Sequence, residues 1–140
     1  MKKNIINFCL SFAIIFSFAN IVVFASETSG TIDTTYKYAK VCDSADCTAS
    51  STINFNASGG NVTIVDSSTA TATISGYAWG STLGWIKMNP SGSGVFVNVT
   101  TGSTTGYAWS GTAGYINFAP TGYGVKINSS GELNGYAWSG

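Results

Sequence analysis

Tyrosine and tryptophan recur at regular spacing through the second half of the sequence. The tetrapeptide GYAW begins at Gly76, Gly106 and Gly135, and a further ring follows two of these copies in GWIKM and GYINF. Exposed rings form a stacking platform for sugars or an adhesive surface for a partner, because large exposed apolar patches mark interaction sites. The candidate ligand-stacking residues are Tyr77, Trp79, Trp85, Tyr107, Trp109, Tyr115, Tyr136 and Trp138.

The alternation of side chains along a strand gathers these rings on one side of a sheet. Within GYAW, Tyr77 and Trp79 share one face and Ala78 lies on the other, and the later copies repeat this pattern. We expect the aromatic face to be buried as a second apolar layer, held in register by cross-strand ring pairs. An exposed row of rings is the alternative.

Two cysteines, Cys42 and Cys47, lie close together in the segment VCDSADC. An even pair in an exported chain predicts a disulfide. Metal binding is the alternative, but two thiols in a sequence without histidine make at most half a zinc site. We therefore predict a Cys42–Cys47 bond, no metal site and no cofactor.

The residues that usually perform catalysis are scarce. Asp43 and Asp46 lie between the cysteines, where solvated turn residues are expected, and Glu132 is the only acid within the regular repeats. A glycosidase needs two acids held around a cleft, and the many serines and threonines have no histidine base to activate them. The sequence predicts a protein that is not an enzyme.

The first 25 residues have the features of a secretory signal peptide. Lys2 and Lys3 precede an apolar stretch, and the small residues of VFA, ending at Ala25, suit cleavage before Ser26. An uncleaved membrane anchor is the alternative, because the apolar run is close to spanning length. We expect residues 26–140 to form one secreted or cell-surface domain.

This predicted domain has the wrong charge for binding nucleic acid. It contains four lysines, no arginine and six acidic residues, which gives a net charge of −2. Nucleic-acid binding depends chiefly on lysine and arginine neutralising phosphates. That class of partner is excluded.

Internal repeats organise the domain. Full copies of about 30 residues span 76–105 and 106–134, and 135–140 begins another GYAW. Residues 31–75 form a divergent copy, in which KYAK replaces GYAW and STINF matches GYINF. Its first hairpin has six extra residues, which include both cysteines, so we expect the disulfide to staple this longer loop.

Each copy supplies three short segments rich in valine, isoleucine, threonine and aromatic residues, bounded by glycine, proline and asparagine. Glycine-centred turns favour an all-β antiparallel meander of about ten strands, curled into a sandwich or barrel, and a β-solenoid is the alternative. We expect an aliphatic core face that contains Ile53, Phe55, Ile86, Met88, Val95, Val97, Val99, Ile116, Phe118, Val125 and Ile127.

The last GYAW copy is predicted to cover a sheet edge. We expect residues 132–139 to pair in cis with 124–128, with Leu133 on the core side, because an open edge invites pairing with other chains. A truncated array is one alternative. Donation of this strand to a neighbouring molecule, which would be self-association through edge strands, is another.

Tandem GYAWS and GWINF units behind a signal peptide resemble a family of exported repeat proteins from uncultivated bacteria, and GTIDTTYKYAKVC with GNVTIVDS resembles the opening of those chains. This chain departs from that pattern at Lys40, where the family has the GYAW tryptophan, and at Tyr115, where it has the GWI tryptophan. The family has no established activity, so the resemblance implies an exported repeat protein and transfers no functional residue.

Two function classes remain. One is a structural or adhesive module at the cell surface, which needs only a stable β-domain of low charge. The other is a module that binds polysaccharide or cell-wall glycan, which needs the aromatic face in water. The exposure of the rings therefore discriminates between them.

Overall fold

The computed structural model describes residues 29–42, 47, 50–66 and 70–140. The predicted signal peptide lies outside these residues, as do Asp43 and Asp46. The described chain contains strands and turns and no helix, so it has no helix that could cross a membrane. The strands are β1 (Ser29–Thr31), β2 (Tyr38–Cys42), β3 (Ser50–Asn54), β4 (Thr63–Asp66), β5 (Thr71–Ser75), β6 (Tyr77–Gly80), β7 (Gly84–Lys87), β8 (Val95–Asn98), β9 (Thr104–Ser110), β10 (Gly114–Asn117), β11 (Lys126–Ile127) and β12 (Leu133–Asn134).

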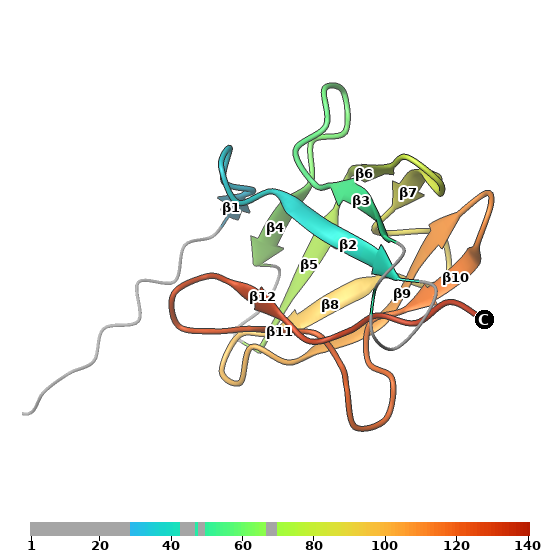
Figure 1. The fold of residues 1–140 in the computed structure, drawn as a ribbon. Coiled ribbons are helices and arrows are strands. Elements are labelled where there is room, and N and C mark those ends of the chain that lie inside the picture. Colours follow the sequence, from blue (N-terminus) through green and yellow to red (C-terminus); the bar gives the residue numbers. More distant parts are fainter. Residues whose placement is uncertain (1–28, 43–46, 48–49, 67–69) are drawn as a thin grey trace, which may run out of the picture.

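The predicted antiparallel meander is confirmed. Ten of the described strands form one sheet in the order β1-β4-β5-β8-β9-β7-β6-β3-β2, with β10 also paired to β9, and β11 and β12 form a separate ribbon (Figure 1). Every described ladder is antiparallel. The expectation of a barrel is wrong, because β1 and β2 end the described sheet without pairing to each other. The GYAW strands of the two full repeats are not direct neighbours, because β7 lies between β6 and β9.

Strand β9, at the start of the second full repeat, is kinked and joins two parts of the sheet. The first half of β9 pairs with β8, where Thr104 lies opposite Val97, and its second half pairs with β10, where Ala108 lies opposite Ile116. Gly106 lies at the change of partner with a φ of 86°, which favours glycine. A Cβ atom there would overlap the carbonyl oxygen of Gly94, so the kink also brings two backbones into close contact.

The aliphatic face forms the predicted core. Seven of the expected residues are buried, which are Ile86, Met88, Val95, Val97, Ile116, Phe118 and Val125. Ile53, Phe55 and Ile127 are partly buried and pack against this cluster. Most of the core assignment is therefore confirmed.

Two residues expected in the core are exposed. Val99 is 44% exposed because β8 ends at Asn98, whose side chain caps the following turn by accepting hydrogen bonds from the N–H groups of Thr100 and Thr101. Leu133 is 40% exposed because β12 pairs with β11 alone in the described chain and no strand covers its other side. Alternation along the sequence cannot detect where the neighbouring strand stops.

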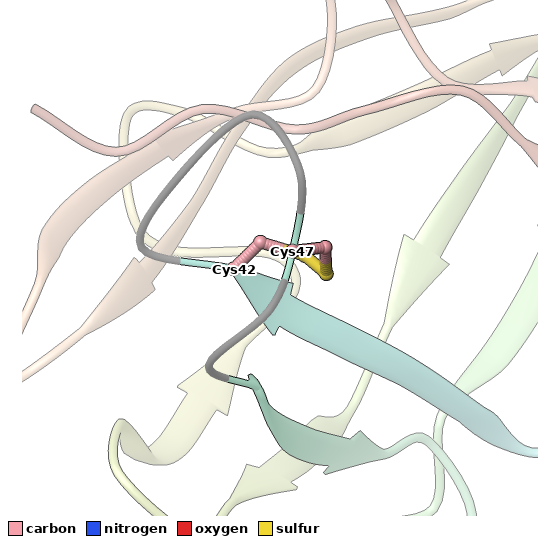
Figure 2. Close-up of a disulfide and its surroundings, with 2 residues drawn as sticks. All are labelled: Cys42 and Cys47. Carbon is pink, nitrogen blue, oxygen red and sulfur yellow. A yellow bond between two sulfur atoms is a disulfide. The ribbon is translucent and has the colours of Figure 1, made fainter.

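The predicted disulfide is confirmed. Cys42 and Cys47 are bonded at the end of β2 (Figure 2). Cys42 also pairs in register with Ser50, the first residue of β3. The bond therefore closes the enlarged loop at its junction with the β2–β3 hairpin.

The last GYAW segment pairs in cis, as expected, but with two partners. Leu133 and Asn134 pair with Ile127 and Lys126 of β11. Further along, Trp138 forms an isolated bridge with Asn117, with backbone N···O distances of 2.7 and 2.9 Å. The segment therefore covers the edge of β10 as well as the edge of β11.

Candidate functional site: an exposed aromatic face

The aromatic face is open to solvent, so the expectation that it is buried is wrong. Six of the eight candidate rings are between 41% and 52% exposed, and Tyr136 and Trp138 are almost 70% exposed. The alanine of GYAW explains why the rings face outward. Ala78 and Ala108 are completely buried against the core. Alanine takes the core side of these strands, and the rings occupy the outer face of the same strands.

In each full repeat, three of these rings form an edge-to-face triad. In the first triad the Trp85 ring centroid lies 6.3 Å from Tyr77 and 5.1 Å from Trp79. These separations and the steep interplanar angles are those at which aromatic pairs attract each other. Each ring therefore keeps a defined orientation on the surface.

The second triad repeats this geometry with a different central ring. Tyr115 lies 6.1 Å from Tyr107 and 4.7 Å from Trp109. The departure of Tyr115 from the tryptophan of the repeat pattern therefore preserves the packing of the triad.

The last GYAW segment has a ring pair of another kind. Tyr136 lies 6.4 Å from Tyr123, which belongs to the turn before β11. Sequence reasoning missed Tyr123 because the matching turn of the previous repeat has Ser93 at this position. Trp138, two residues after Tyr136, forms the backbone bridge to Asn117.

Strand register arranges the face into three rows that cross the strands. Directly opposite residues on neighbouring strands lie side by side on one face of a sheet. Each row contains a tyrosine, then a polar residue, then a tryptophan. The first row is Tyr38, Asn54, Trp79 and Trp85; the second is Tyr77, Lys87, Trp109 and Tyr115; the third is Tyr107, Asn117 and Trp138.

The polar position of the rows was not among the sequence-predicted site residues. Lys87 and Asn117 each lie two residues after the central ring of a triad, so alternation alone would have placed them on the aromatic face. In the first and third rows the residue is an asparagine that caps a turn. Asn54 Oδ1 accepts from the N–H of Asn56 at 2.9 Å, and Asn117 Oδ1 accepts from the N–H of Ala119 at 2.8 Å.

The hollows on and beside this face are open and not enclosed. One open hollow of about 220 Å³ lies between Tyr77, Trp85 and Gly59. A larger open hollow of about 540 Å³ lies outside the rows, between β9, β11 and the segment that leads to Tyr136. Open hollows of this kind suit the side of an extended polymer better than a small molecule, which usually needs an enclosing pocket.

Charged groups on or near this face are few. The described residues contain no cluster of three histidine, cysteine or acidic side chains that could hold a metal ion. Asp33, in the loop between β1 and β2, accepts hydrogen bonds from the N–H groups of Tyr36 and Thr35, and these bonds lower the pKa of its carboxyl from its ordinary value. Asp33 does not belong to any row.

Comparison of the chain with protein-family models, with curated proteins and with solved structures found no match.

Proposed function

We propose that this domain is a non-catalytic glycan-binding module of an exported protein, and that the three rows form its binding surface. One observation carries the proposal: six tyrosine and tryptophan rings lie in fixed edge-to-face triads while remaining 41% to 52% exposed. Rings that are already oriented lose little conformational freedom when a ligand binds. The polar residue of each row adds a hydrogen-bonding group beside the rings.

The shape of the face supports a polymeric ligand, which is a polysaccharide or cell-wall glycan. Rows that lie next to one another on one sheet face can contact successive sugars of a single chain. The disulfide and the signal-like first 25 residues support an extracellular location, where such glycans are found.

The test is a pair of matched alanine variants. Trp109→Ala removes a ring from the second row and its triad, and we expect binding to insoluble chitin or peptidoglycan to weaken about tenfold, as for an aromatic side chain central to an interface. Tyr36→Ala is the control, because Tyr36 is 89% exposed and lies outside the rows. Wild-type tryptophan fluorescence should also be quenched by acrylamide and protected by the bound glycan.

Equal binding by both variants, or no protection of the tryptophans, would contradict the glycan-binding proposal. A structural module that associates with copies of itself would then be favoured. The observation behind this second candidate is that β1 and β2 end the described sheet with backbone groups available for pairing. Sedimentation analysis would show concentration-dependent oligomers in that case.

A further inference from the structure

We propose that the second row, Tyr77, Lys87, Trp109 and Tyr115, selects a glycan that carries carboxylates, with the Lys87 ammonium binding the carboxylate of an acidic sugar. This inference rests on the proposed glycan-binding function and names its ligand class. The three rows share one pattern, but only the second has a charged residue at the polar position.

Strand register places Lys87 between two rings. Lys87 lies directly opposite Tyr77 on β6 and opposite Trp109 on β9. Opposed side chains in an antiparallel sheet have Cβ atoms about 5 Å apart. A sugar ring stacked on Trp109 therefore lies within reach of the Lys87 side chain.

The Lys87 ammonium has no partner within the described chain. Its side chain is half-buried yet forms neither an ion pair nor a hydrogen bond with the described residues. The asparagines of the other rows instead use Oδ1 to cap the turn that follows. Lysine has no acceptor atom and cannot make this cap, so the local turn does not account for the charge at position 87.

The charge distribution favours an anion on this face. Lys40 lies on the same face of β2 as Tyr38, one alternation further along the strand. The three acidic residues of the described chain are Asp33, Asp66 and Glu132, and none of them belongs to a row. Glu132 is already bonded, because its Oε2 accepts from Asn128 Nδ2 at 2.7 Å. The rows therefore combine stacking rings with positive charge that has no acidic neighbour within a row.

The experiment compares soluble glycans that share a backbone and differ in carboxylates. One pair is oligogalacturonate and its methyl ester, and the other is carboxymethyl chitin and neutral glycol chitin. Affinities are measured by calorimetry for the wild type, for Lys87→Asn and for Lys126→Asn. The last variant removes the same charge from an exposed position on β11 that lies outside the rows.

We expect the wild type to prefer the carboxylated member of at least one pair by about fivefold or more, in the range of a charge-assisted hydrogen bond that is partly exposed. Lys87→Asn should abolish the preference and retain binding to the neutral member, while Lys126→Asn should keep it. The preference should also decline as salt is added. Lys87→Asn should fold normally, because asparagine occupies the matching position in two rows, and Lys87→Gln is the substitute if it does not.

The possible failures are distinguishable. Equal affinity of the wild type for both members of each pair, or a preference that survives in Lys87→Asn, overturns the carboxylate inference and leaves the glycan-binding proposal standing. Absence of binding to all four glycans overturns the carboxylate inference, and if Trp109→Ala also behaves as wild type toward insoluble glycans, the proposed function fails with it.

Discussion

Glycine at the start of GYAW is a geometric requirement at three positions. Gly76, Gly106 and Gly135 have φ values of 87°, 86° and 104°. At each of them a Cβ atom would overlap a backbone carbonyl in the turn that precedes the third strand of the previous repeat. The recurrence of this residue in the sequence therefore has a local physical cause that is independent of ligand binding.

The first prediction concerns this kink. Gly106→Ala should destabilise the domain by roughly 3 kcal/mol or more, because strain at positive φ adds to the overlap with Gly94. The measurement is urea unfolding followed by tryptophan fluorescence. Gly111→Ala is the control, since no atom lies within 4 Å of its Cβ position and its φ is not positive. Equal stability of the two variants would contradict the explanation.

Side-chain identity also determines how the hairpin of the third copy closes. The hydroxyl of buried Ser110 donates to the Leu83 carbonyl at 2.8 Å and accepts from the N–H groups of Thr112 and Ala113. The matching residue of the previous copy is Gly80, where a Cβ atom would be 3.1 Å from that of Leu83. Glycine at position 80 therefore leaves room for Leu83, whereas serine at position 110 bonds to the Leu83 carbonyl.

At the scale of elements, the β2–β3 hairpin differs from the others because a covalent bond closes its loop. The double variant Cys42→Ser, Cys47→Ser should lose roughly 2 kcal/mol of stability, since a bridge across so short a loop removes that much chain entropy from the unfolded state. Chemical denaturation of the variant measures this change. Reduced wild-type protein should match the variant, and a variant as stable as the oxidised protein would show that the loop needs no staple.

Alternation predicted well which face of a strand each side chain lies on, but it did not predict where the neighbouring strands end. Ile86 and Ile116 are buried and Trp85 and Tyr115 are exposed, as the period of two requires. Val99 and Leu133 follow the same alternation and are nevertheless exposed, since one lies beyond β8 and the other lies on a strand covered on one side only. Whether such residues are buried depends on the lengths of other strands, and a local sequence pattern carries no information about those lengths.

Exposure of the candidate site was the feature that sequence reasoning got wrong. The aromatic pattern selected eight rings, all of which are exposed, but it omitted Tyr38 of the first row and favoured a second buried layer over a solvent-facing surface. The deciding fact is that the rings on the outer face of β6, β7, β9 and β10 are 41% to 52% exposed. Lys87 was missed for a related reason, because its position between Tyr77 and Trp109 depends on pairing between two repeats.

At the scale of the whole molecule, the rows lie at the junctions between repeats. The second row takes Tyr77 and Lys87 from residues 76–105 and Trp109 and Tyr115 from residues 106–134. The first and third rows cross the neighbouring junctions in the same way. A single repeat contains no complete row.

The number of binding rows follows from this arrangement, because each repeat inserted into the array adds one junction and therefore one row. A chain with a second copy of residues 76–105 inserted after residue 105 should present four rows and retain a long polysaccharide at least tenfold more strongly, since linked sites raise avidity without any new kind of contact. Its affinity for a monosaccharide, which occupies one row, should change little. Equal retention of the polymer by the three-row and four-row chains would show that the rows do not act together. Otherwise, duplication of a repeat changes how strongly the protein is retained on a polymer without changing the contacts that recognise each sugar.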